Sequence, residues 1–158
     1  MNSLVFPCVR CGARRVTLRE GPGRTYSHRV FPALTVPANV GIPTCGRCYA
    51  EYIDEQTAAM LEPVLAAEYK KELSRRATHA IAALSPHLSQ AFLERLLDIS
   101  QGYLSRVNRG HGTPSAQLVV LLALLARNPD LLEWVALYWT EPCEGESPLT
   151  SDSGRVPK

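Results

Sequence analysis

The sequence predicts a mostly α-helical protein that carries a small β module at its N-terminus. Residues 1–50 are rich in Arg, Gly, Pro and β-branched residues, which is typical of short strands joined by turns. From residue 54 onward, apolar residues recur at helical spacing until a polar stretch begins at residue 141. Four of the five cysteines form two Cys-x-x-Cys pairs inside the N-terminal module. The module is therefore expected to hold a metal.

Four segments are expected along the chain: a four-cysteine module over 1–53, a helical connector over 54–72, a helical domain over 73–140 and a disordered tail over 141–158. The tail is polar and contains Pro, Gly and Ser, a composition typical of disorder. No stretch reaches the roughly 18 consecutive apolar residues that a membrane helix needs. The N-terminus lacks the basic start and apolar core of a secretion signal, so a cytoplasmic protein without a membrane partner is expected.

The two cysteine pairs, Cys8 with Cys11 and Cys45 with Cys48, have the spacing of a structural zinc site. A disulfide framework is not expected in a chain without a secretion signal. Four thiolates fill the tetrahedral shell of Zn²⁺ and leave no position for a catalytic water. We therefore predict a structural Zn²⁺ cofactor, with iron in the same geometry as the alternative. Cys143 stands apart in the predicted tail and is interpreted as a free thiol.

The 33 residues between the two pairs exceed the roughly 15–20 residues of the commonest spacing. Doubling a loop costs only about 0.6 kcal/mol of closure entropy, whereas a structural zinc site contributes roughly 10 kcal/mol or more. The long loop also has room for two strands, expected at 14–20 (RRVTLRE) and 27–37 (SHRVFPALTVP), with a turn at GPGR between them. Gly12 and Gly46 are expected where the two cysteine turns pass close to the metal.

The helical region is expected to begin after Asp54, which suits an N-cap. Pro63 is expected to kink the first run or to open a second helix, because proline removes a backbone donor and its ring clashes with the preceding turn. Four shorter helices are expected to follow, at 89–98, 100–110, 114–127 and 128–139, with Asn128 as the cap of the last.

The helix expected at 114–127 is apolar nearly all round, which predicts burial on more than one face. The last helix contains Trp134, Tyr138 and Trp139 and is expected to cover it or to form a dimer contact.

Charge is distributed unevenly along a chain whose net charge is only +2. Residues 1–50 contain seven arginines and one acid, and no acid occurs between Asp98 and Asp130. The basic N-terminal segment is expected either to contact phosphates or to attract an acidic partner protein.

The stretch LSQAFLERLLDISQGYLSRVNRGHGTPS, at 88–115, is expected to form two short helices joined by a tight turn. Ser100 is expected to cap the second helix, which would expose Gln101, Gly102, Ser105, Arg106 and Arg109. Gln can pair with adenine and Arg with guanine through two hydrogen bonds each. Side chains near the start of a recognition helix are those that meet base edges. The stretch is therefore a candidate for DNA recognition.

The same stretch resembles the helix-turn-helix of the Xre/Cro family of bacterial and phage regulators. The matching residues are Leu88, Ser89, Gln90, Leu93, Leu97, Ile99, Ser100, Gln101, Tyr103, Leu104, Ser105, Arg106, Gly110, Thr113 and Pro114. The resemblance implies that Gln90 touches phosphate and buttresses the recognition helix. It further implies that Gln101, Gly102, Ser105 and Arg106 face the bases, and that Asn108 and Arg109 lie near the DNA backbone.

Two positions depart from the Xre/Cro pattern. Where the family has Ala four residues after the Gln, this chain has Glu94, which is expected to reach solvent or to pair with Arg95 or Arg106. Where the family has Gly in the turn, this chain has Asp98. Asp tolerates a left-handed backbone conformation better than most residues.

The whole arrangement is similar to MqsA-type antitoxins with a YgiT-type zinc finger, over roughly residues 6–137. That similarity implies a zinc-ribbon-like domain joined by a helical connector to an Xre/Cro-type bundle. It also implies a homodimer through the C-terminal helices, operator binding to double-stranded DNA, and a toxin or other protein partner at the N-terminal module. We expect an autoregulatory transcriptional regulator of bacterial or phage type. The alternative is a protein-interaction adaptor of a mobile element or multi-protein complex. An enzyme is not expected, because no catalytic cluster stands out.

Overall fold

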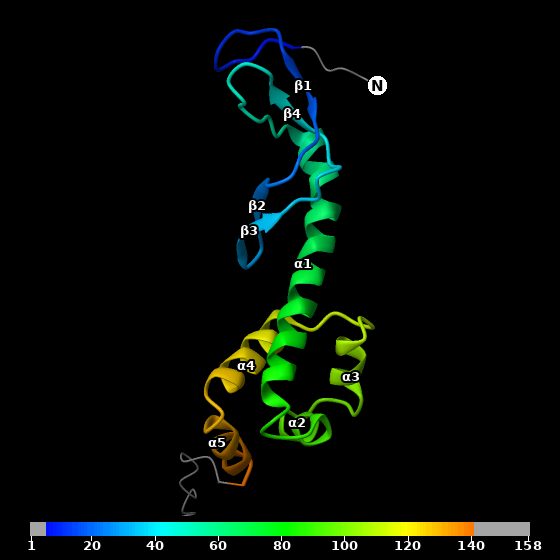
Figure 1. Ribbon diagram of the computed structural model, residues 1–158, viewed down its shortest axis with the longest axis vertical. Helices are drawn as coiled ribbons and strands as arrows, with labels where there is room; N and C mark the ends of the chain where they lie inside the picture. The colour runs from blue at the N-terminus through cyan, green and yellow to red at the C-terminus, as the bar shows by residue number, and fades with distance from the viewer. Residues whose placement is uncertain (1–5, 141–158) are drawn as a thin grey trace, which may run out of the picture.

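The computed structural model describes residues 6–140, so the predicted tail and Cys143 lie outside the described residues. The elements are β1 (Val16–Arg19), β2 (Thr25–His28), β3 (Phe31–Thr35), β4 (Ile42–Cys45), α1 (Glu55–Leu84), α2 (Gln90–Leu96), α3 (Tyr103–Asn108), α4 (Ala116–Arg127) and α5 (Leu131–Tyr138). The molecule is elongated, with the strands beside the first half of α1 and the other helices around its second half (Figure 1). The predicted combination of helices with a small N-terminal β region is confirmed.

The strands form two separate antiparallel ladders, β1 with β4 and β2 with β3. The first ladder places Val16 opposite Cys45. The strand that follows the first cysteine pair is thereby hydrogen-bonded to the strand that ends at the second pair. The predicted single strand at 27–37 is wrong, because a turn at Arg29 and Val30 divides it into the end of β2 and all of β3. Arg29 takes a left-handed φ of 51° in this turn. Both turn residues are exposed, and the reversal lets Phe31 face the core.

Helix α1 runs without interruption through Pro63, so the expectation that Pro63 opens a second helix is wrong. The Asp54 carboxylate accepts a hydrogen bond from the Thr57 amide at 2.8 Å, which confirms the predicted N-cap. Pro63 lies on the exposed side of the helix, where the carbonyl that loses its partner can turn to water. The 30 residues of α1 span about 45 Å. The predicted connector and the first helix of the helical domain are therefore one continuous rod.

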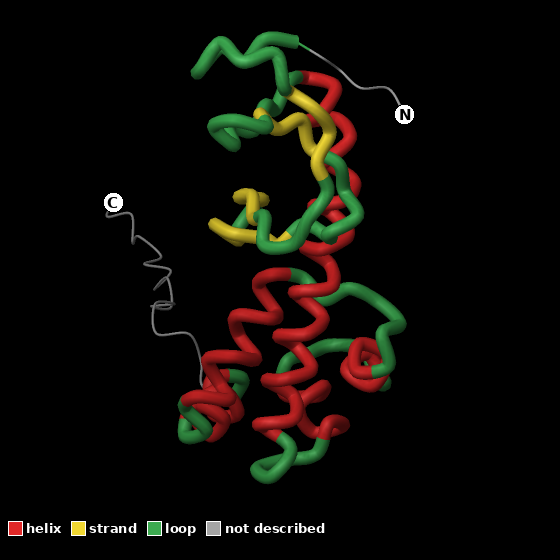
Figure 2. The backbone as a smooth tube through the Cα atoms, turned by 45° about the horizontal axis from the view of Figure 1, so that its top comes forward, coloured by secondary structure: helices red, strands yellow, loops and turns green. Residues whose placement is uncertain are grey.

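One apolar core joins the β2–β3 hairpin to the helices through the buried stripe of α1. Its buried members are Phe31, Leu34, Val36, Ile42, Leu61, Leu65, Tyr69, Leu73, Ala77, Ala80, Ile81, Leu84, Leu93, Leu104, Val107, Val119, Leu122 and Leu125. A second, smaller cluster surrounds Cys8, Val16 and Cys45. Helices α3 and α4 pack on opposite sides of α1 (Figures 1 and 2).

Within the single chain, α4 is buried on one face only, contrary to the prediction for the segment 114–127. Helix α4 buries Val119, Leu122 and Leu125, while the side chains of Val120 and Leu124 on its other face are 59% and 50% exposed. None of the described helices combines the length and the apolarity that a membrane crossing requires.

The junction between α4 and α5 also differs from the prediction. Asp130, not Asn128, occupies the N-cap of α5. Asn128 instead ends α4, and its side-chain amide donates to the carbonyl of Leu124 at 3.1 Å.

Candidate metal centre and nucleic-acid face

The four paired cysteines form one cluster beside the β1–β4 ladder. The sulfur atoms of Cys8, Cys11, Cys45 and Cys48 all lie within 4.8 Å of one another. The Cys8 and Cys48 sulfurs are 3.6 Å apart, and the Cys11 and Cys45 sulfurs are 3.7 Å apart. Sulfurs held about 2.3 Å from a tetrahedral ion would be about 3.8 Å apart, whereas a disulfide bond is only about 2.05 Å long. The cluster therefore fits a tetrahedral metal ion, and a four-thiolate shell suits both zinc and iron.

The two Cys-x-x-Cys turns share one backbone construction. The residue after the second cysteine, Gly12 or Tyr49, donates its amide to the carbonyl of the first cysteine, at 2.7 and 3.0 Å. Both residues have left-handed φ angles, 72° for Gly12 and 59° for Tyr49. Tyr49, rather than Gly46, is therefore the counterpart of Gly12 in the second turn. The Gly46 amide donates to the Arg15 carbonyl at 2.8 Å, and an added Cβ would lie 3.4 Å from that oxygen.

Tyr52 is a supporting residue that the sequence did not reveal. Its hydroxyl donates to the Cys8 sulfur at 2.8 Å across 44 positions of the chain. This hydrogen bond lowers the pKa of Cys8 to about 6 and so favours the thiolate that a metal requires. The Tyr52 ring is held edge-on by Phe6, with centroids 5.4 Å apart. Backbone amides of Cys48 and Arg47 similarly lower the pKa of Cys45.

Replacing Tyr52 by phenylalanine is expected to weaken metal affinity by about 10- to 100-fold, the usual effect of losing an outer-shell partner. The physical reason is that the Cys8 thiolate loses its donor while the ring keeps its packing. Competition with a chromophoric chelator measures the change. Tyr49→Phe is the matched control, because Tyr49 lies on the other turn and is 67% exposed. Equal metal affinities for the two variants would show that the Tyr52 hydroxyl does not support metal binding.

Arginines surround the cysteine turns on the outside. We name Arg10, Arg14, Arg15 and Arg47 the basic knuckle surface; all four are exposed. Within residues 6–140, none of them forms an ion pair with an acid. Arg24 is different, since its guanidinium donates to three backbone carbonyls and so braces the chain. The knuckle surface is therefore free to meet a negatively charged partner.

The predicted DNA-contacting residues gather on and around α3. Gln101, Arg106, Asn108 and Arg109 are exposed, whereas Gln90, Gly102 and Ser105 are half-buried. Helices α2 and α3 contact each other, joined by residues 97–102. Leu104 and Val107 anchor α3 in the core, with exposed fractions of 0% and 1%. The opposite face of α3 is thereby directed outward, with basic and amide side chains and no acid.

Glu94 holds the start of α3 in place. It is only 3% exposed, and its two carboxylate oxygens accept hydrogen bonds from the amides of Gly102 and Leu104, each at 2.8 Å. The expectation that Glu94 would reach solvent or pair with Arg95 or Arg106 is therefore wrong. The first amides of a helix lack hydrogen-bond partners within the helix, and a negative charge near them interacts favourably with the helix dipole. Glu94, on the neighbouring helix α2, supplies both the hydrogen-bond acceptors and the negative charge.

The predicted cap at Ser100 is wrong, because Glu94 and not Ser100 accepts the hydrogen bonds of the first amides of α3. The N-cap of α3 is Gly102, which forms no side-chain cap and has a left-handed φ of 76°. Gly102 thus shapes the turn and presents its amide to Glu94, and it has no side chain to offer a base. Asp98 takes a left-handed φ of 50°, as the tolerance of Asp for this conformation led us to expect. Among the described residues, Gln90 makes no side-chain hydrogen bond to α3.

No protein-family model and no curated protein matches this chain. The fold and the site define a protein in which a four-cysteine β module and a helical unit share one long helix. The cysteine site was predictable because its ligands lie in local pairs. Glu94 and Tyr52 were not recognised as supporting residues. A usable signal existed for Glu94, namely an acid directly beside Leu93 on the inward face of a short helix.

Proposed function

We propose that the protein is a sequence-specific DNA-binding transcriptional regulator, in which α2 and α3 form a helix-turn-helix and α3 enters the major groove. The observation that carries this proposal is the outward face of α3, which presents basic and amide side chains from a helix held by Glu94. No acid lies between Asp98 and Asp130 to repel phosphate.

The side chains have distinct proposed roles. Gln101, in the turn before α3, and Arg106, on α3, suit adenine and guanine edges, and the half-buried Ser105 precedes Arg106 on α3. Asn108 and Arg109, at the end of α3, suit phosphate contacts that set the register of the protein on the duplex. Gly102 contributes close backbone approach rather than a reading side chain. Gln90, the first residue of α2, is proposed to touch phosphate.

The proposal extends to an autoregulatory, antitoxin-like homodimer that acts in the cytoplasm. The four cysteines are proposed to hold structural Zn²⁺, since a closed thiolate shell offers no site for catalysis. The unpaired arginines of the basic knuckle surface support a toxin or other acidic protein as the partner of the β module. The exposed apolar side chains of α4 and α5 support association of two copies through the C-terminal helices.

Arg106→Ala tests the base-reading role directly. We expect weaker binding to the operator and a loss of roughly 1–3 kcal/mol of discrimination at one base pair. A footprint on the DNA upstream of the protein's own gene, at fixed salt, locates the operator, and titrations against single-base variants measure the discrimination. Lys70→Ala is the control, because Lys70 is an exposed base on α1, outside α2 and α3. Unchanged binding of Arg106→Ala to every sequence would refute base reading.

An adaptor that joins other proteins remains the second candidate. It is favoured by the same exposed apolar side chains and by the basic knuckle surface, both of which suit protein partners. Metal-loaded protein that protects no DNA but retains a specific protein partner would favour the adaptor.

A further inference from the structure

Helix α5 is apolar yet buries none of its residues. Its inward face, Leu132 and Val135, packs against the core, and the indole of Trp139 donates to the Leu96 carbonyl at 3.1 Å. Its outward face carries Trp134 and Tyr138, which are 60% and 52% exposed and stack with centroids 5.5 Å apart. Two large aromatic residues at helical spacing, left in water, indicate a surface that another chain covers.

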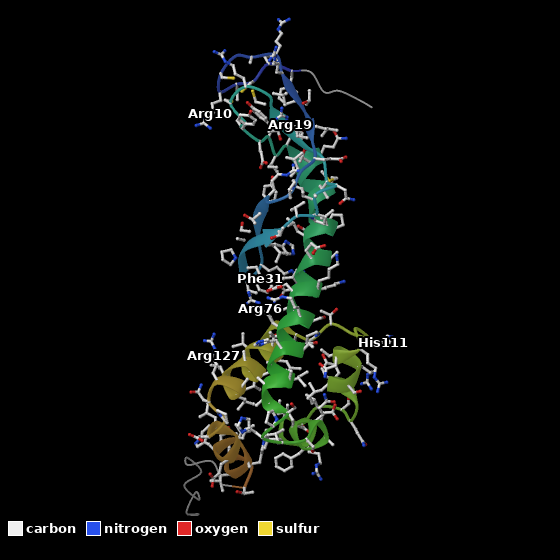
Figure 3. All side chains as sticks on the ribbon, viewed as in Figure 1. Arg10, Arg19, Phe31, Arg76, His111 and Arg127 are labelled. Carbon is white, nitrogen blue, oxygen red and sulfur yellow. The ribbon has the colours of Figure 1, made fainter. Side chains whose placement is uncertain are left out.

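An apolar groove lies at the other end of the same side of the molecule. It has a volume of about 650 Å³, and its lining includes Val30 and Phe31 from the hairpin, Leu73 and Arg76 from α1, and the outward residues of α4. The guanidinium of Arg76 lies 4.7 Å from the centre of the Phe31 ring, and both residues line the groove (Figure 3). Val30, at the tip of the hairpin, is 64% exposed.

The charges of the two surfaces are complementary. Helix α5 and its N-cap contain two acids, Asp130 and Glu133, and no base. Beside the groove lies a second hollow whose lining includes Arg76, His79 and Arg127 and no acid. Arg76 is already paired with Glu72, whereas Arg127 forms no ion pair within residues 6–140. An α5 helix placed in the groove would therefore bring its acids toward Arg127, and its aromatic residues toward apolar side chains.

The hairpin, α4 and α5 all lie on one side of α1, and α3 lies on the other (Figures 1 and 2). Two copies related by a twofold axis between antiparallel α4 helices would thus meet through this side. Each α5 would then face the groove of the other copy, which closes the contact as a symmetric pair. Both α3 helices would remain free.

We propose that the groove between the β2–β3 hairpin and α4 is the docking site for α5 of a second copy of this chain. This inference rests on the homodimer of the proposed function and gives it a specific geometry, in which the hairpin is part of the interface. The outward stripe of α4, Val120, Leu121 and Leu124, forms the middle of the contact. Trp134 and Tyr138 of each copy enter the groove of the other.

Val30→Asp tests this geometry in the full-length, metal-loaded protein. A carboxylate at the hairpin tip is exposed in the monomer, but would lie in an apolar contact in the dimer, where it is unfavourable. We expect the dimer dissociation constant to rise by about tenfold or more, measured by sedimentation over a range of concentrations. Met60→Asp is the control, since Met60 is a 38% exposed apolar residue of α1 outside the groove and outside the cysteine turns. Both variants should keep full metal content and helix content.

A photo-crosslinking residue at position 30 locates the partner independently. Cross-linked peptides from 131–139 of a second copy would support the proposal, and cross-links to any other segment of the second copy would overturn it. A Val30→Asp dimer as tight as the wild type would likewise overturn it. If the wild type is monomeric at all concentrations, the homodimer itself fails. Base reading by α3 is judged separately, from the Arg106→Ala titrations.

Discussion

Glu94→Ala is expected to lower the free energy of unfolding by about 2–4 kcal/mol and to abolish the proposed specific binding to DNA. The variant removes a buried acceptor from the amides of Gly102 and Leu104. Each hydrogen bond to a charged group contributes about 1.5–3 kcal/mol, and a buried amide left without a partner is costly. Urea unfolding followed by circular dichroism measures the stability, and the operator titration measures binding.

Glu94→Gln separates the two hydrogen bonds from the volume of the side chain. Its amide keeps one acceptor oxygen but places an NH₂ group where the second carboxylate oxygen stood. We expect about half the loss of stability seen for alanine. Glu68→Ala is the control, because Glu68 pairs with Lys71 on the surface of α1, and such pairs contribute less than about 1 kcal/mol. Equal stability of Glu94→Ala and Glu68→Ala would show that the cap is dispensable.

Metal removal is expected to unfold the cysteine turns and the end of the β1–β4 ladder at Val16 and Cys45, while the β2–β3 hairpin stays folded on α1. The reason is the division of the core. The cluster around Cys8, Val16 and Cys45 has few apolar members, so it depends on a metal worth roughly 10 kcal/mol. Phe31 and Leu34 of the hairpin belong instead to the large helical core.

Amide hydrogen exchange with and without chelator measures this effect segment by segment. Loss of protection is expected at the Val16 end of β1 and the Cys45 end of β4. Protection is expected to be retained in β3, in α1 and at Ile42, which belongs to the large core. Cys45→Ser should reproduce the chelated state, whereas Cys143→Ser should keep one metal ion per chain. Loss of protection in β3 as well would mean that the hairpin depends on the metal. Protein purified without zinc or iron would contradict the metal site.

Predictions that depend on neighbouring residues were the most accurate. The cysteine cluster was predicted from two Cys-x-x-Cys pairs. The N-cap was predicted at Asp54, whose carboxylate accepts a hydrogen bond from the amide of Thr57, three residues later. The left-handed turn at Asp98 belongs to the same class. Where a local rule failed, packing had overridden it. Pro63 does not interrupt α1, because the buried stripe of the helix runs past it on the opposite side.

The amino-acid order alone settles the mostly helical composition, the basic N-terminal segment and the four sulfur ligands, since each depends on residue type and short spacing. The tertiary structure determines which buried polar groups have hydrogen-bond partners and which residues supply those partners. A buried carboxylate such as Glu94 would be unfavourable on the inward face of α2 alone. It becomes favourable because it accepts hydrogen bonds from the first amides of α3 once the two helices pack together. Tyr52 acquires its role only when the chain returns to Cys8. The reason is physical: a buried polar group costs free energy or contributes to stability according to its partner, and that partner comes from a distant part of the chain.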